Sequence, residues 1–274
     1  MRRTIALFGL AALLFAACAN ETKPEAAQPS RVGVRAANYK FVAPTTVKAG
    51  AVRISLTNAG PEPHQAQLFR LNAGATPQQV ITAAKTSDLN VYKLGAFAGG
   101  SNAVDAGESQ VSTVNLTAGN YVFMCLLPDP KGRAHASLGM VKALTVTENA
   151  EPAEMPAGTY QTASAKEFSF QLPTSWSGTI SFTNTGKQPH EFQIMEIKKG
   201  KTEQDFLKAF QGPPGAGPPP FETGGGAAAV APGGSQTFNA NLKPGTYFMM
   251  CFVTDPVKKA PHFALGMLKK FVVK

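Results

Sequence analysis

The chain has 274 residues and a formal net charge of +9, from 26 lysines and arginines against 17 aspartates and glutamates. Its hydrophobic fraction of 43% and charged fraction of 16% exclude an extended disordered chain, because such chains are poor in apolar side chains and rich in charge. The positive charge is spread without an arginine cluster or an aromatic stacking motif, so we expect no nucleic acid as a partner and attribute the charge to solubility and to attraction of acidic proteins.

The first 18 residues have the pattern of an export signal. Two arginines precede an apolar stretch over 5–17, which is shorter than the roughly 20 residues that a membrane-spanning helix needs. The sequence of 15–18, Phe-Ala-Ala-Cys, resembles a bacterial lipoprotein processing box, which implies a lipid anchor on Cys18 and attachment to a membrane. Residues 17–19 also fit an ordinary signal-cleavage pattern, so plain secretion stays open. We expect an exported protein in the periplasm or at the cell surface.

Two segments rich in proline, alanine and polar residues divide the rest of the chain. Residues 19–32 predict a flexible tether, and residues 148–159 predict a linker. The segments that they delimit, 33–147 and 160–274, share one sequence pattern at an offset of about 126 residues. Each is of ordinary domain size, so we expect two similar domains.

Within each of these segments, the elements follow in the same order. Alternating, β-branched residues over 52–57 and 178–183 predict strands with one buried face, and Asn-x-Gly turns follow them. The next strand of each segment begins near a histidine. Thr76 before a proline, and Thr202 before acidic residues, then predict the N-terminal caps of one short helix in each domain.

The C-terminal part of each segment also predicts strands. Residues 116–121 and 242–247 resemble the tyrosine corner of Greek-key sandwiches, which gives Tyr121 and Tyr247 structural roles. A cysteine-bearing strand, a loop and a closing strand follow. The expected fold is therefore all-β, with two tandem Greek-key β-sandwiches, each with a short inserted helix.

Four chemically distinctive residues occur in both segments at offsets of 126 or 127 residues. They are His64, Cys125, His135 and Met140 in the first, and His190, Cys251, His262 and Met267 in the second. They include all four histidines of the chain and both cysteines beyond Cys18. Two imidazoles, a thiolate and a thioether suit copper, because soft sulfur favours Cu(I) and imidazole accepts both oxidation states. We expect one copper site per domain, up to two ions in all.

The lone cysteine of each segment supports this interpretation. Structural cysteines of exported domains normally pair within the domain, and one cysteine cannot do so. A metal ligand explains an unpaired thiol. The alternative is a disulfide between Cys125 and Cys251, which requires the two positions to meet within about 7 Å between their α-carbons.

The segments around the cysteines resemble the C-terminal motif of the blue copper proteins, the cupredoxin family of plastocyanin and azurin. The motif residues are 119–125, His135 and 139–141 in the first segment, and 245–251, His262 and 266–267 in the second. The resemblance implies that His64 and His190 are the first histidine ligands, Cys125 and Cys251 the thiolates, His135 and His262 the second imidazoles, and Met140 and Met267 the weak axial ligands.

One departure from the family concerns the loop between the cysteine and the second histidine. Family members commonly have two to four residues there, whereas this chain has nine, over 126–134, and ten, over 252–261. The sequences Pro-Asp-Pro at 128–130 and Asp-Pro at 255–256 indicate an ordered turn that returns the histidine to the metal. A blue copper centre, a distorted copper centre and a copper storage site without fast redox chemistry are all compatible with such loops.

The resemblance implies electron transfer with a redox protein partner. A copper carrier or storage protein, which exchanges copper with a donor or acceptor, and a metal-free interaction module are the alternatives. Multicopper oxidases and copper nitrite reductases join similar domains, but their catalytic centres need further histidines. All four histidines of this chain are already assigned, so we do not expect an enzyme.

The two domains differ around the second histidine. Phe263 and Leu265 follow His262, whereas Ala136 and Ser137 follow His135. Exposed apolar patches often mark interaction sites, so we expect partner docking at Phe263 and Leu265 in the second domain. The lysines at 258–259 are placed to steer an acidic partner.

Overall fold

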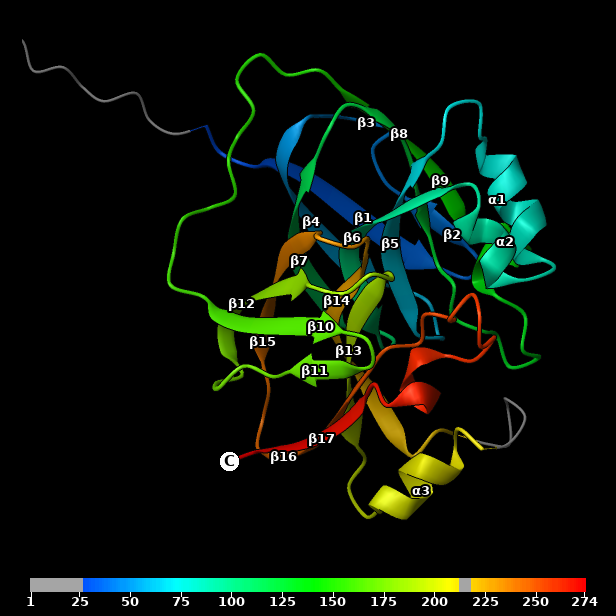
Figure 1. Cartoon of the computed structure of the whole chain (residues 1–274), viewed down its shortest axis with the longest axis vertical. Coiled ribbons are helices and arrows are strands. Elements are labelled where there is room, and N and C mark those ends of the chain that lie inside the picture. Colours follow the sequence, from blue (N-terminus) through cyan, green and yellow to red (C-terminus); the bar gives the residue numbers. More distant parts are fainter. Residues whose placement is uncertain (1–26, 212–217) are drawn as a thin grey trace, which may run out of the picture.

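The computed structural model describes residues 27–211 and 218–274, which form two large β-sheets (Figure 1). The strands of the first sheet are, in spatial order, β11 (Ser169–Gln171), β10 (Gln161–Lys166), β12 (Ser177–Asn184), β15 (Ser235–Asn241), β7 (Ser109–Leu116), β4 (Gly50–Asn58), β1 (Ser30–Ala37) and β2 (Lys40–Val42). Those of the second are β17 (Leu268–Val273), β16 (Gly245–Met250), β13 (His190–Ile197), β14 (Phe221–Val230), β6 (Gly95–Val104), β5 (His64–Leu71), β8 (Gly119–Met124), β9 (Val141–Thr147) and β3 (Thr46–Lys48).

The strands form where apolar and polar residues alternate, because successive side chains of a strand point to opposite faces. In β4, Val52, Ile54 and Leu56 are fully buried, while the residues between them are exposed. Ile180 and Phe182 occupy the matching buried positions of β12. These residues line the space between the two sheets.

Each half of the chain contributes strands to both sheets and so builds a β-sandwich. The pairings of the first half, β1 with β2 and β4, and β5 with β6 and β8, have counterparts in the second, β10 with β11 and β12, and β13 with β14 and β16. The phenol of Tyr121 donates to the carbonyl of Thr117, and that of Tyr247 to Lys243, both at 2.9 Å. The predicted β-sandwich class and the two tyrosine corners are confirmed.

The helices are short and lie outside the sheets. They are α1 (Pro77–Ala84), α2 (Asp88–Tyr92) and α3 (Glu203–Lys208), with one-turn 3-10 helices η1 (His135–Leu138) and η2 (His262–Leu265). Thr76 and Thr202 cap α1 and α3, each in a reciprocal capping box. The first half thus has two inserted helices where one was expected, because α2, capped by Ser87, is too short to leave a periodic pattern.

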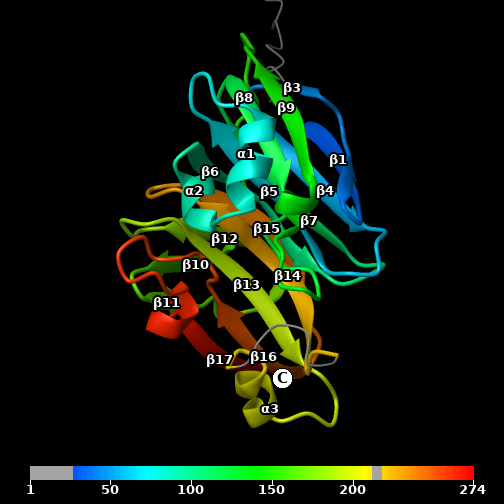
Figure 2. The same cartoon turned by 90° about the vertical axis from the view of Figure 1, so that its right-hand side faces the viewer.

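The two halves are joined into continuous sheets. Strand β7 pairs with β15, and β6 pairs with β14, so each sheet runs through both halves, which lie one above the other in Figure 2. Buried amide side chains reinforce the join: Gln67 exchanges hydrogen bonds with the backbone of Ala229, and Gln193 does the same with Ala103. The two tandem sandwiches therefore share continuous β-sheets and are not connected by the linker alone.

In the part of the chain that the structure describes, no helix is long and apolar enough to cross a membrane. The expected export signal and lipidation site at Cys18 lie outside the described residues. Both remain predictions.

Candidate metal centres

In the first half, three potential ligands converge from three elements. His64 is the first residue of β5, Cys125 directly follows β8, and His135 begins η1. The Nδ1 atoms of the two histidines are 3.2 Å apart, and the sulfur of Cys125 lies 3.3 Å from Nδ1 of His135 and 4.0 Å from Nδ1 of His64. All three residues are fully buried.

The second half builds the same triangle. His190 begins β13, Cys251 follows β16, and His262 begins η2. Their corresponding separations are 3.1 Å between the Nδ1 atoms, and 3.5 and 3.9 Å from the sulfur to His262 and His190. Both cysteines are free, so the alternative disulfide between Cys125 and Cys251 is wrong.

The size of each triangle fits a metal ion. A circle through the three ligand atoms has a radius of about 2 Å in both halves, which is close to the ~2.0–2.3 Å that separate a metal such as zinc from imidazole nitrogen and thiolate sulfur. Two imidazoles and one thiolate in a trigonal arrangement are the donor set of blue copper sites. The donor atoms therefore fit copper, with room for one ion in each half.

Met140 and Met267 lie directly beside these triangles. Each follows a glycine with positive φ, Gly139 at 102° and Gly266 at 124°, which ends the one-turn helix. The carbonyls of the two methionines accept hydrogen bonds from the N–H groups of Cys125 and Cys251, at 3.3 and 3.2 Å. Both methionine side chains are fully buried, each in the apolar cluster that contains its cysteine.

The long cysteine-to-histidine loop of the first half is an ordered excursion. The carboxylate of Asp129 accepts hydrogen bonds from the N–H groups of Lys131 and Arg133 and forms an ion pair with the Arg133 side chain. The N–H of His135 then donates to the carbonyl of Leu127 at 2.9 Å. The two ends of the loop are thus fastened together, and the extra residues do not displace the histidine.

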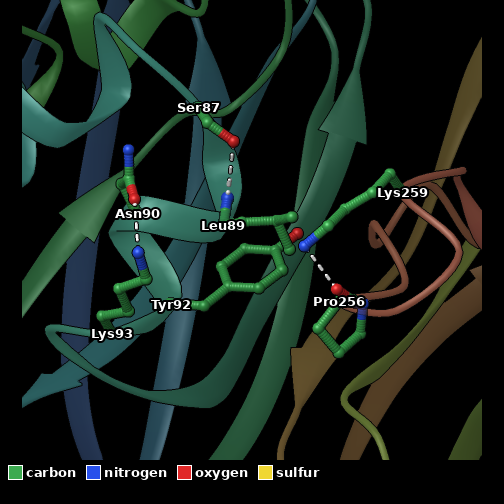
Figure 3. A pocket seen from close by; sticks show the side chains of 7 residues that line it. All are labelled: Ser87, Leu89, Asn90, Tyr92, Lys93, Pro256 and Lys259. Atoms are coloured by element: carbon green, nitrogen blue, oxygen red, sulfur yellow. Dashed lines mark hydrogen bonds between the residues drawn. The ribbon is translucent and has the colours of Figure 1, made fainter.

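The corresponding loop of the second half is closed in the same way. Asp255 accepts hydrogen bonds from the N–H groups of Val257 and Lys258, and the N–H of His262 donates to Val253 at 2.9 Å. This loop is also fastened to the first half. The N–H of Thr254 donates to the phenol of Tyr92, at 3.3 Å, where α2 meets the loop across the notch shown in Figure 3.

The outer nitrogens of the first pair of histidines have acceptors that sequence reasoning missed. Nε2 of His64 donates to the side-chain oxygen of Asn38 at 2.7 Å, and Nε2 of His135 donates to Glu62 at 2.9 Å. These acceptors place the proton on Nε2 and leave both Nδ1 lone pairs directed at the triangle. The ring of Tyr39 lies against His135, with centroids 4.9 Å apart.

In the second half, the carboxylate and amide acceptors are exchanged. Nε2 of His190 lies 3.3 Å from the carboxylate of Glu167, and Nε2 of His262 lies 3.0 Å from the amide oxygen of Gln188. Glu62 and Gln188 both stand two residues before the first histidine, at the repeat offset, and this regularity was the available signal. Asn38 and Glu167 do not follow the offset, so the sequence offered no equivalent signal for them.

Burial sets the protonation of the ligands in the absence of metal. Burial, followed by the neighbouring histidine, lowers the pKa of His64 and of His262 to about 4. Burial also lowers the pKa of His135 and His190, against the opposing effect of the nearby glutamates. The imidazoles are therefore neutral and ready to coordinate at pH 7.

The thiols respond to burial in the opposite sense. Burial raises the pKa of Cys125 to about 12 and that of Cys251 well above its ordinary value. A neutral thiol is a poor ligand, so metal binding must release its proton. A cation in the triangle supplies the charge that stabilises the thiolate in this dry environment.

A buried carboxyl group distinguishes the second site. Glu191 follows His190, and burial raises its pKa to about 7. Its oxygens accept hydrogen bonds from the N–H of Phe252, at 2.7 Å, and from the side chain of Asn102, at 3.2 Å. The corresponding residue of the first half is Gln65, a neutral side chain.

The expected docking residues follow His262 on η2. Phe263 is partly buried and packs against Phe210 and Phe252, with centroids 5.6 and 5.3 Å apart, and Leu265 is also partly exposed. In the first half, Ala136 is fully buried because α1 packs on η1. In the first half, α1 thus covers η1, the one-turn helix that begins with the second histidine. In the second half, the aromatic side chain of Phe210 contacts the equivalent helix η2.

No protein-family model matches the chain, and no curated protein matches it. Among solved structures, reduced auracyanin from the photosynthetic bacterium Roseiflexus castenholzii is 26% identical, with a TM-score of 0.27, over 43% of this chain and 99% of that chain. Auracyanin A of Chloroflexus aurantiacus, a "blue" copper protein, is 19% identical over 44% of this chain and 100% of that chain, with a TM-score of 0.32. Copper nitrite reductase of Nitrosomonas europaea is 12% identical over 90% of this chain and 94% of that chain, with a TM-score of 0.26.

Such TM-scores are too low to support a function by themselves. The fold and the metal sites are instead identified from the strand pairings and donor atoms of this chain. The two halves are tandem cupredoxin-like β-sandwiches, and each contains a His-Cys-His group that fits copper.

The lowered pKa of the histidines predicts a pH dependence of the metal-free protein. Between about pH 6.5 and about pH 4, the unfolded chain binds protons at His64 and His262 that the folded chain does not bind, so stability falls as pH falls. Glu191 acts in the opposite direction, because its raised pKa favours the folded state below pH 7, but four histidines oppose one carboxyl. We expect a smaller free energy of unfolding at pH 5 than at pH 7 in urea titrations.

The double variant His64→Gln, His262→Gln serves as the control and should lose less stability over the same pH interval. An unfolding free energy of the metal-free wild type that is equal at both pH values, or higher at pH 5, would contradict this account.

Proposed function

We propose that this protein transfers electrons through one type 1-like copper ion in each half, which two histidines, one cysteine and one methionine would hold. The observation that carries the proposal is the pair of buried triangles of two Nδ1 atoms and one sulfur atom. Copper bound there supplies a one-electron couple, Cu(I)/Cu(II). The first ion would be held by His64, Cys125, His135 and Met140, and the second by His190, Cys251, His262 and Met267.

The protein residues would keep both oxidation states in one geometry. The histidine rings are fixed from outside by Asn38, Glu62, Glu167 and Gln188, and the cysteines are fixed by strand ends and by the methionine carbonyls. Ligands that are held in this way move little when the charge of the ion changes. Complete burial of all the ligands also excludes water, which stabilises a thiolate–metal bond and limits side reactions.

The enzyme alternative requires more histidines than the chain has. Trinuclear and three-histidine copper centres need imidazoles in addition to those of the type 1 site, and the sequence has four histidines, two in each triangle. A catalytic copper centre of that kind therefore needs ligands from another molecule. We propose electron transfer rather than catalysis as the function of a single chain.

Addition of Cu(II) tests the proposal and separates its alternatives. Two ions should bind per chain and give an intense visible thiolate charge-transfer band. Because the sites share no ligand, Cys125→Ser should bind one ion fewer and lose about half of the band, and Cys251→Ser is the matched control with the opposite site intact.

Copper binding without an intense band would support storage or transport instead of electron transfer. No binding at all would support a metal-free interaction module. Loss of both ions in Cys125→Ser would contradict two independent sites.

We propose further that the second half exchanges electrons with an external, acidic redox partner at Phe263 and Leu265. The support is the position of η2, which begins with His262 and presents the partly exposed Leu265 beside the lysines of the preceding loop. The equivalent residue of the first half, Leu138, is also partly exposed, but its helix η1 is contacted by α1. A partner that docks at η2 would therefore approach the metal-binding histidine more closely than a partner that docks at η1, and the electron would travel a shorter distance.

Leu265→Ser should slow electron exchange with a small acidic redox protein several-fold, and Leu138→Ser should leave it near the wild-type rate. Stopped-flow measurements at low and high salt check this, since salt screens the attraction between lysines and an acidic partner. Copper content must be unchanged in both variants. Equal rates for the two variants would contradict electron exchange with the partner at the second half.

We also propose that the chain is exported and anchored by a lipid on Cys18, with the tether over 19–32 between the anchor and the first sandwich. The support is the apolar segment and the Phe-Ala-Ala-Cys sequence that ends it. Cys18→Ser should move the protein from the membrane fraction to the soluble exported fraction, or block processing, as seen by fractionation and immunoblotting. Unchanged membrane association or an unlipidated mature wild type would contradict the anchor.

A further inference from the structure

One buried hydrogen bond connects the two halves at the second metal centre. The side-chain amide of Asn102, on β6, donates to the carboxyl group of Glu191, on β13, at 3.2 Å. Both side chains are buried, with 1% and 6% of their surface exposed. Asn102 is further fixed because its amide also donates to the carbonyl of Ala227, at 3.2 Å, and its oxygen accepts from the N–H of Ala103, at 2.9 Å.

Both residues of this hydrogen bond lie close to proposed metal ligands. Glu191 is adjacent to His190 in the chain, and its N–H lies 3.5 Å from the sulfur of Cys251. On the other side, Asn102 is two residues from Val104, which lies opposite His64 in the pairing of β5 with β6. The covalent chain, the Asn102–Glu191 hydrogen bond and the pairing of β5 with β6 together lead from the ligands of one site to a ligand of the other.

The sheet geometry shows why such a connection matters. Val230 faces His190 and Val104 faces His64, and Val230 lies opposite Ala98, six residues from Val104. With ~3.3 Å per residue and ~4.8 Å between strands, the two histidines are on the order of 20–25 Å apart. An electron that moves between the sites must cross protein, and a bonded path carries it better than packed side chains alone.

The pseudo-equivalent position lacks this bond. At the offset of 126 residues, Asn102 corresponds to Ala228 and Glu191 corresponds to Gln65. Ala228 has no side-chain donor. By contrast, the glutamine bonds at the join are duplicated, with Gln67 to Ala229 matched by Gln193 to Ala103. The Asn102–Glu191 bond is therefore an added feature and not part of the symmetric join.

We propose that the Asn102–Glu191 hydrogen bond is the bridge through which one electron passes between the two metal centres. The step oxidises the reduced ion of one half, Cu(I) to Cu(II), and reduces the oxidised ion of the other, Cu(II) to Cu(I). No bond is made or broken, and no proton is needed. This proposal rests on the proposed function and specifies the path of the electron between the two metal centres. An electron that is accepted at one half would leave the protein from the other half.

The test uses the copper-loaded chain with a photo-oxidant on the first half. Lys131 is exposed on the 126–134 loop, so Lys131→Cys, in a Cys18→Ser background, places a ruthenium label near the first site, while Cys125 and Cys251 are buried. A flash oxidises the first ion, and the electron from the second ion then refills it at a rate independent of protein concentration. The visible signatures of the two sites are taken from the single-site variants.

Asn102→Ala should slow this internal refilling several-fold without changing the copper content or the two thiolate bands. The variant places at 102 the residue that the second half has at 228, so the strand tolerates it. Gln236→Ala is the matched control, because Gln236 makes buried bonds across the join to Gly100 and within its own half to Ala228 but touches neither site. The control should refill at close to the wild-type rate.

Wild-type refilling in Asn102→Ala, or equal slowing in Gln236→Ala, would overturn the bridge and leave the proposed function standing. Absence of a thiolate band at both sites in the parent protein would instead overturn the function itself.

A measurement without copper tests the bond on its own. In the metal-free protein, Glu191→Gln should shift the side-chain amide NMR signal of Asn102 and leave that of Asn149 in place, since Asn149 donates to the carbonyl of Ala49 in the first half, away from Glu191. An Asn102 signal that does not respond would show that the two side chains are not bonded, and the bridge would fail.

Discussion

A thiol and two imidazoles buried together away from water are the constraint to which the rest of each sandwich is adapted. Burial keeps the imidazoles neutral and raises the pKa of the thiols, so the group binds protons or a metal but cannot remain charged alone. Each ligand is accordingly placed at a point where the backbone is already fixed: the first residue of a strand, the residue after a strand, or the first residue of a one-turn helix. Rigid placement and exclusion of water are the properties that an electron-transfer metal site requires.

Much of this arrangement could be predicted from the sequence, because it depends on local patterns. The alternation over 52–57 and the threonine caps at 76 and 202 act within a few residues, and they predicted strand β4 and helices α1 and α3. The long loops between cysteine and histidine could also be interpreted locally, since Asp129 and Asp255 each accept hydrogen bonds from N–H groups a few residues further on.

The features that the sequence did not reveal depend on residues far apart. Gln67 and Gln193 resemble ordinary polar strand residues, and only the pairing of β6 with β14 turns them into contacts across the join. Asn38 and Glu167 reach the histidines from loops whose positions do not follow the repeat offset. The partial burial of Phe263 also depends on distant residues, because Phe210 and Phe252 approach it from other segments.

The pairing of β6 with β14 and of β7 with β15 also determines how the protein can be divided. Severing the chain within 148–159 would leave on each half two strand edges with unpaired backbone groups and an apolar sandwich end. Since the edges of the two halves are related by an approximate twofold axis, the same surface of an isolated half would be complementary to itself. In the intact chain, covalent linkage keeps the two different halves together, so neither half pairs with a copy of itself. A substitution on one side of the join can therefore affect the other half without the same substitution occurring on both sides.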